Sequence, residues 1–332
     1  MWLLVCCALV LLMVVVGGVT RLTRSGLSIV EWQPIAGTLP PLDAAAWDAM
    51  FAKYRETPEY LKVNRGMSLE EFKGIFWWEY IHRLLGRAIG LVFLLPLLWF
   101  AFRRQIERGM IPRLVGIFCL GGLQGAIGWW MVSSGLVETP RVSHVRLAVH
   151  LGTAFLIFAG MWWTALGLLA PCSRPDLSVE RARLAHLGGW LCTGIFVMVL
   201  SGALVAGTRA GYAYNTFPLM DGHLVPPGLG VMTPWWDNFL HNLTLVQFNH
   251  RAIAWLLAIM IPSFWLKARK VELPASVRRP LNLLLGMLVV QVALGISTLL
   301  LQVPVPLGAA HQGGALVLFA LGLWSAHALR HG

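Results

Sequence analysis

The chain has 332 residues, of which 57% are apolar and only 12% are charged. Soluble globular domains carry roughly 25% charged residues, so this composition excludes a water-soluble fold and indicates a membrane protein. The formal net charge of +11 does not indicate nucleic-acid binding, because Lys and Arg lie in short segments between apolar runs. The five cysteines contain no C-x-x-C pair, and so do not support a disulfide framework or a thiol redox motif: Cys6, Cys7, Cys119, Cys172 and Cys192.

Apolar runs of about 20 residues, the length that crosses a bilayer, occur eight times along the chain. They span residues 1–19, 75–101, 114–133, 143–169, 185–206, 241–266, 281–302 and 307–329. The first run lacks a charged n-region and an A-x-A cleavage site, so we interpret it as a helix and not as a signal peptide. The sequence therefore predicts an all-α membrane protein with eight transmembrane helices and both termini on one side.

The distribution of Lys and Arg in the connecting segments predicts the orientation of the chain. Basic residues gather after the second, fourth and sixth runs: Arg103, Arg104, Arg108, Arg113, Arg174, Arg181, Arg183, Lys267, Arg269, Lys270, Arg278 and Arg279. The long loop 20–74 balances seven basic against seven acidic residues, and 207–240 carries one basic and two acidic residues. We therefore expect the basic loops and both termini to be cytoplasmic, and the two other loops to face outward.

Short motifs from the first half of the chain recur in the second half at an offset of 184 to 186 residues. Gly17, Thr23-Arg24, Gly26, Pro34 and Pro40-Pro41 recur as Gly202, Thr208-Arg209, Gly211, Pro218 and Pro226-Pro227. Four helices per half is an even number, so both halves insert with the same topology. The sequence predicts two tandem four-helix bundles, residues 1–170 and 171–332, related by a parallel pseudo-two-fold repeat.

Four of the ten histidines recur between the halves: His82, His150, His250 and His311. Each lies in the first turns of an inward-running helix, about 6 to 14 Å below the outer surface at 1.5 Å per residue. Ionisable side chains at that depth are costly and indicate a function. Zinc requires three or four protein ligands, whereas haem iron requires only one or two axial ligands, so two imidazoles per bundle favour haem.

The remaining polar residues receive simpler interpretations. Gln124 and Gln291 recur mid-helix and are expected to make interhelical hydrogen bonds. Histidines without a repeat partner lie at helix ends or in loops and are expected to be solvated: His144, His223, His241, His327 and His331.

Two arginines and one carboxylate add candidate roles around the histidines. Arg24 and Arg209, just outside the first and fifth helices, are candidates to bind anionic propionates, with interfacial anchoring as the alternative.

Glu79 lies three residues before His82 and shares its helix face, whereas Gln247 occupies the matching place in the second half. A carboxylate in a dry site indicates proton or cation chemistry, so the first half is predicted to be reactive. Alternatively, Glu79 orients His82 or pairs with the neighbouring Arg83.

With these motifs the chain resembles the haem A synthase family of cytochrome oxidase assembly over nearly its whole length. The supporting segments are the G-G-V-T-R-L-T-R-S-G-L-S run from Gly17 to Ser28, the E-Y-I-H-R run from Glu79 to Arg83, and the four duplicated histidines. The resemblance implies that His250 and His311 bind a haem b cofactor, and that substrate haem O lies between His82 and His150. It also implies oxidation of the porphyrin C8 methyl to a formyl group through hydroxylated intermediates, with Glu79 as the catalytic carboxylate.

The resemblance carries further expectations. Some members have a cysteine pair in the first outer loop; this chain has no cysteine between Cys7 and Cys119, so it is similar to the branch without that pair. The loop, with Trp32 and Trp47, is expected to cover the substrate pocket. The implied location is the bacterial inner membrane, the implied partners are haem O synthase and cytochrome oxidase assembly factors, and a homo-oligomer is left open.

Two other functions fit the same pattern of residues. A di-haem b-type electron-transfer or quinol-oxidising cytochrome would also place paired histidines on four-helix bundles, but it needs no carboxylate in one half only. A duplicated transporter could use Glu79 to relay protons, with the histidines lining the pathway.

Overall fold

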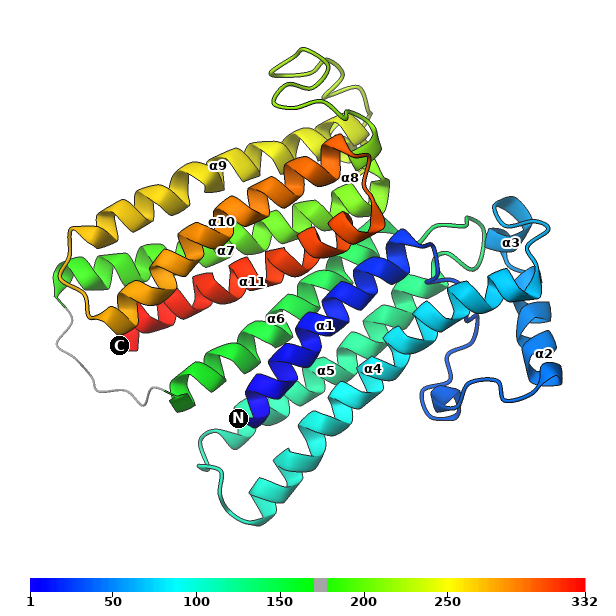
Figure 1. Cartoon of the computed structure of the whole chain (residues 1–332), viewed down its shortest axis with the longest axis horizontal. Coiled ribbons are helices and arrows are strands. Elements are labelled where there is room, and N and C mark those ends of the chain that lie inside the picture. Colours follow the sequence, from blue (N-terminus) through cyan, green and yellow to red (C-terminus); the bar gives the residue numbers. More distant parts are fainter. Residues whose placement is uncertain (170–177, 332) are drawn as a thin grey trace.

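The computed structural model describes residues 1–169 and 178–331 and is helical throughout its membrane-spanning part (Figure 1). Within the described residues, eight helices are long and apolar enough to cross a membrane. They are α1 (Trp2–Leu22), α4 (Leu69–Phe102), α5 (Ile111–Ser133), α6 (His144–Leu169), α7 (Val179–Thr208), α9 (Leu243–Arg269), α10 (Ala275–Leu300) and α11 (Val305–His331). The short elements are η1 (Ala36–Thr38), α2 (Ala44–Arg55), α3 (Pro58–Lys62), η2 (Ala210–Tyr212), η3 (Trp235–Asp237) and α8 (Asn238–His241). The expected number and order of the long helices are confirmed.

The long helices gather into two groups that lie side by side (Figure 1). In one group α1 packs on α4 and α6, and α5 packs on α6; in the other α7 packs on α9 and α11, and α10 packs on α11. The groups meet where α1 and α6 contact α7 and α11. Both termini lie at one end of the molecule, opposite α2, α3 and α8 (Figure 1). The expected boundary between residues 170 and 171, like Cys172 and Arg174, lies outside the described residues.

The long helices expose large apolar side chains over most of their outer surface. Leu91, Leu95, Leu98 and Trp99 on α4 are each more than half exposed. Apolar patches of this extent would be unstable in water, and lipid is the solvent that they suit. The helices are therefore those of a multi-pass membrane protein.

Three helices begin six residues before the apolar run that predicted them. In α4 a capping box adds the first turns: Ser68 accepts from the Glu71 backbone N–H, and the Glu71 carboxylate accepts from the Ser68 backbone N–H at 2.8 Å. Ser178 caps α7 in a similar way, whereas α10 begins after Pro274 without a side-chain cap. Four arginines expected in loops consequently lie on helical turns: Arg181, Arg183, Arg278 and Arg279. Arg113 likewise lies on α5, and Lys267 and Arg269 lie in the last turn of α9.

The long segment 20–74 is more ordered than a loop. It contains η1, α2, α3 and the start of α4, and together with the next turns of α4 it forms a mainly aromatic core: Ile29, Tyr54, Phe72, Phe76 and Tyr80. The rings of Trp47 and Phe76 meet edge to face at 4.9 Å between centroids. Trp32 stacks on Trp129 of α5 at 6.1 Å. These aromatic contacts fix the segment over the ends of α4 and α5 that lie opposite the chain termini.

Candidate functional site

The four recurring histidines lie on alternate long helices and share one packing arrangement. Each ring lies against a glycine of a neighbouring helix, so closely that an added Cβ would come within 2.9 to 3.1 Å of the ring Cε1 atom. The pairs are His82 with Gly17, His150 with Gly128, His250 with Gly202 and His311 with Gly295. A side chain at any of these glycines would displace the imidazole, so glycine is needed where each helix backbone approaches the ring.

The histidines occur as two pairs, on α4 and α6 in one group of helices and on α9 and α11 in the other. Among residues 1–169 and 178–331, no group of three or more His, Cys, Asp or Glu side chains converges as metal ligands would. Each pair therefore offers a metal two imidazoles and no third His, Cys, Asp or Glu ligand within these residues. A porphyrin supplies four nitrogens, so the donor set fits haem iron with two axial imidazoles.

Gln124 and Gln291 make the expected interhelical hydrogen bonds, and both of them reach a histidine. Gln124 Nε2 donates to the backbone carbonyl of His150 at 2.9 Å, and Gln291 Nε2 donates to that of His311 at 3.0 Å. Each glutamine thus fixes the helix turn that carries one of the recurring histidines.

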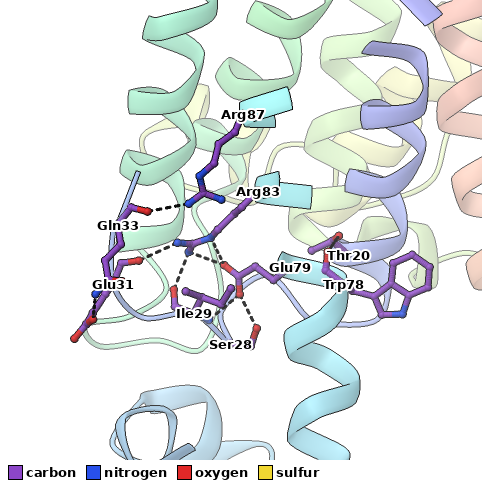
Figure 2. Close-up of polar contacts among 9 residues, drawn as sticks. All are labelled: Thr20, Ser28, Ile29, Glu31, Gln33, Trp78, Glu79, Arg83 and Arg87. Carbon is purple, nitrogen blue, oxygen red and sulfur yellow. Dashed lines mark hydrogen bonds and ion pairs between the residues drawn. The ribbon is translucent and has the colours of Figure 1, made fainter. Parts of the chain in front are cut away.

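Glu79 is buried, with 2% of its surface exposed, and all its hydrogen-bond partners are donors (Figure 2). Its Oε2 accepts from the Ser28 hydroxyl at 2.7 Å and the Ile29 backbone N–H at 2.8 Å. Its Oε1 accepts from Arg83 Nε at 3.1 Å and Nη2 at 2.7 Å. This donor set suits an ionised carboxylate, which can only accept. The pairing of Glu79 with Arg83, the alternative interpretation of the sequence, is therefore present.

Two arginines of α4 also attach the segment 28–34 to the helix (Figure 2). Arg83 donates to the carbonyls of Ile29 at 2.7 Å and Glu31 at 2.9 Å. Arg87 donates to the carbonyls of Gln33 and Pro34, both at 2.8 Å. Arg83 thus has two roles: it neutralises Glu79, and it holds the segment 28–34 that encloses Glu79.

The corresponding position in the other group of helices, around Gln247, has a similar hydrogen-bonding arrangement but no ion pair. Gln247 Nε2 and Arg251 Nη2 both donate to the Tyr214 carbonyl, at 2.9 and 2.8 Å. Arg251 Nη1 donates to the Thr216 carbonyl at 2.9 Å. Here a loop carbonyl takes the place of the carboxylate.

Arg24 and Arg209 both adopt left-handed backbone conformations just after a long helix, with φ of 55° and 62°. Burial lowers the pKa of Arg209, and the charges of Arg24 and Arg141 lower it further. Glu59 of α3 is 4% exposed, and its burial raises its pKa to about 7, which the positive charges of Arg24 and Arg209 oppose. The charges of the two arginines therefore act on a buried carboxylate that the sequence did not single out.

Three of the histidines expected to be solvated are at least partly buried: His144, His327 and His331. His327 on α11 is 4% exposed and packs against the Trp163 ring at 5.0 Å. His144 is partly buried, and its ring meets that of His241 edge to face at 4.8 Å. The rings of His144 and His241 line a cavity of about 300 Å³ beside Arg141, where α6 approaches α7. Sequence spacing gave no signal for these contacts, because they join segments far apart in the chain.

Comparison with known proteins agrees with this arrangement. The family model for cytochrome oxidase assembly protein matches residues 1–323. A haem A synthase of Nitrosospira multiformis is 60% identical over 329 residues, covering 99% of this chain and 92% of the relative. A haem A synthase of Nitrosomonas eutropha is 56% identical over 324 residues, covering 97% of this chain and 91% of the relative. One of Rhodospirillum centenum is 52% identical over 330 residues, covering 99% and 87%.

Proposed function

Since this chain belongs to the cytochrome oxidase assembly protein family, we propose that it acts as a haem A synthase, oxidising the C8 methyl of haem O to the formyl group of haem A. The observation that carries the proposal is the pair of partly buried imidazoles in each group of helices, each lying against a glycine of a neighbouring helix. Relatives at 52 to 60% identity over almost the whole chain are haem A synthases.

The two haem sites are assigned different roles. His250 and His311 hold haem b as the resident cofactor, and His82 and His150 receive haem O as the substrate. The assignment rests on Glu79, because only the first group of helices has a carboxylate at that place, with Gln247 at the other. Haem iron supplies the redox chemistry at such sites.

Glu79 is the proposed catalytic residue. Removing electrons from a porphyrin methyl develops positive charge over the ring, and a fixed carboxylate stabilises that charge or accepts the proton. Arg83, Ser28 and Ile29 hold Glu79 in place with four hydrogen bonds, so the carboxylate needs no reorganisation during the reaction. Arg24 and Arg209, at the outer ends of α1 and α7, are the proposed partners of the haem propionates.

The two groups of helices are proposed to be a tandem repeat, residues 1–170 and 171–332. Contacts between the groups support this: a Cβ at Gly152 would lie 2.8 Å from Leu200, and a Cβ at Gly313 would lie 2.8 Å from Val15. Gly152 and Gly313 each follow a recurring histidine by two residues, and Leu200 and Val15 each precede a recurring glycine by two. A two-fold relation between the halves generates such exchanged contacts.

The remaining assignments follow from the proposed activity. The protein resides in the bacterial inner membrane with both termini in the cytoplasm, and it receives haem O from haem O synthase. Haem A passes to cytochrome oxidase assembly factors, and the lipid bilayer surrounds the exposed helix faces.

Pigment analysis of the purified protein tests the function and the location of the cofactor together. We expect extracted pigments to include haem O and haem A beside haem b, and we expect His250→Ala or His311→Ala to lower haem b because each removes an axial ligand. His223→Ala, in an exposed loop, is the matched control. Haem b alone in the wild type would favour an electron-transfer cytochrome, a protein without haem would favour a transporter, and unchanged haem b in both variants would move the cofactor to the first half.

A further inference from the structure

The two groups of helices differ in what the Nδ1 atom of their histidines contacts. His250 Nδ1 lies 2.8 Å from the Ser201 hydroxyl oxygen on α7. His82 Nδ1 is buried and has no hydrogen-bond partner. In the first half the residue that corresponds to Ser201 is Val16. Ser201 comes directly before Gly202, which lies against His250, and Val16 comes directly before Gly17, which lies against His82.

The Ser201 hydroxyl has a second contact that bears on its role. It lies 2.8 Å from the backbone carbonyl of Met198, which accepts the hydroxyl proton when His250 carries its own proton on Nδ1. Its oxygen is then free to accept the Nδ1–H of His250. An imidazole that carries its proton on Nδ1 has an unprotonated Nε2, which is the form that binds iron.

The second histidine of the α9 and α11 pair has a different kind of neighbour at Nδ1. Gln291 Nε2 lies 3.2 Å from His311 Nδ1 as well as contacting the His311 carbonyl. Gln124 Nε2 contacts only the carbonyl of His150, whose Nδ1 is buried without a partner. An amide N–H can only donate, so Gln291 does not favour the Nδ1–H form of His311, and the contrast between the two groups of helices rests on His250 and His82.

We propose that Ser201 is a positioning residue that fixes the tautomer and ring orientation of His250, making its group of helices a permanent haem site. Val16 leaves His82 unfixed, so the other site takes up and releases its haem. The inference rests on the proposed function, in which one haem stays as a cofactor and the other must leave as product. Hydrogen-bond partners of this kind hold a ligating histidine and raise its basicity, and their loss typically costs 10- to 100-fold in metal affinity.

Ser201→Val and Ser201→Thr test the proposal as a matched pair, because Val and Thr have nearly the same shape and differ by one hydroxyl. We expect Ser201→Val to lose haem b about 10- to 100-fold faster to excess apomyoglobin. Its midpoint potential should become more positive, because a less basic imidazole stabilises ferric iron less. Ser201→Thr should retain haem b at the wild-type potential, since its hydroxyl can still donate to the Met198 carbonyl and accept from Nδ1.

Val16→Thr is the reciprocal experiment. Supplying a hydroxyl at this place should make haem O and haem A about 10-fold slower to leave the first site. The second site should keep its potential, because Val16 lies on α1 and not beside His250.

The outcomes separate this inference from the proposed function. If His250→Ala leaves haem b unchanged, the assignment of the cofactor fails and the role of Ser201 fails with it. If His250→Ala removes haem b while Ser201→Val matches Ser201→Thr in both haem loss and potential, the positioning role alone is wrong. Faster haem loss and a more positive potential in Ser201→Val, with both restored to wild-type values in Ser201→Thr, would establish it.

Discussion

At the scale of single residues, Glu79 and Gln247 are the most informative pair. Both lie three residues before a recurring histidine and four before an arginine, and both are buried with 2% of their surface exposed. Glu79 forms an ion pair with its arginine at 2.7 Å, whereas Gln247 shares a carbonyl acceptor with Arg251. The two hydrogen-bonding arrangements are therefore similar, but only the one around Glu79 contains a carboxylate and its negative charge.

Glu79→Gln is predicted to retain haem and lose activity. The amide preserves shape and can still accept from Arg83, but it carries no negative charge to stabilise the oxidised porphyrin. We expect the conversion of haem O to haem A to fall by about 10²-fold, the typical loss on removing one electrostatic stabiliser. The measurement is the ratio of haem O to haem A in cells that contain normal amounts of protein and haem b.

The control for Glu79→Gln is Gln247→Glu, which adds the carboxylate to the other group of helices. It should not raise haem A formation, because the substrate is proposed to bind near His82. A near-normal haem A ratio in Glu79→Gln would show that Glu79 only anchors segment 28–34 through Arg83.

Glu59 predicts a pH dependence of stability. Burial raises its pKa from 4.5 to about 7, so between these values the folded protein keeps a proton that the unfolded chain has released. Stability therefore falls as pH rises through this window, by up to about 1.4 kcal/mol per pH unit, and becomes level above pH 7. Glu59→Gln should abolish this slope in detergent melts between pH 5 and 8. Glu56→Gln, at an exposed position, should keep it; an unchanged slope in Glu59→Gln would assign the effect to other groups.

At the scale of helices, the glycines opposite the histidines decide how closely neighbouring helices approach. An added Cβ at Gly295 of α10 would lie 2.9 Å from the Cε1 atom of His311, whereas one at Gly286 of the same helix would have nothing within 4 Å. The first glycine is required by the ring beside it, and the second is not.

Gly295→Ala is predicted to lower haem b binding, because the methyl group must displace the His311 ring by a few tenths of an ångström or more. We expect about a 10-fold faster haem loss, comparable to removing a partner of a ligating histidine. Gly286→Ala should leave haem b unchanged, and alanine's higher helix propensity should not destabilise α10. Equal haem loss in the two variants would contradict a steric role for Gly295.

The helix boundaries show what apolar length alone misses. The first turn of α4 carries Glu70, Glu71 and Lys73, which an apolar scan rejects, yet the Ser68 capping box continues the helix beyond the hydrocarbon. Segment 20–74 gave no apolar run of transmembrane length. Its order comes from aromatic side chains that meet only when α2, α3 and α4 pack together.

At the scale of the whole molecule, α1 joins the two groups of helices by polar as well as apolar contacts. Gln312 of α11 donates to the Val14 carbonyl at 2.7 Å, and Arg21 donates to the Ala206 carbonyl of α7. Trp162 of α6 donates to the Ala320 carbonyl of α11 at 3.0 Å. In lipid such bonds have no competition from water, so they favour one relative placement of the groups.

The orientation in the membrane is predicted by the basic segments, which should face the cytoplasm. Single cysteines at Lys270 and Ala45, both exposed, test it in a background without the native cysteines. In intact cells a membrane-impermeant maleimide should label residue 45 from outside and residue 270 only after the membrane is opened. Labelling of residue 270 from outside would invert the topology and move the histidines to the inner side.

The sequence by itself determined the eight helices, their order, and the four histidines that recur between the halves. These features depend on local apolar length and on internal repetition, both of which can be read along the chain. It also singled out Glu79, because its counterpart is an amide.

Only the tertiary structure decided which side chains meet. The partners of Glu79 at Ser28 and Ile29 come from 50 residues away, and the Ser201 hydroxyl reaches His250 from another helix. It also brought the charges of Arg24 and Arg209 within range of Glu59 and buried His327, because both depend on how the chain packs. Periodicity fixes the face of a helix on which a residue lies, but the packing of neighbouring helices fixes what that face contacts.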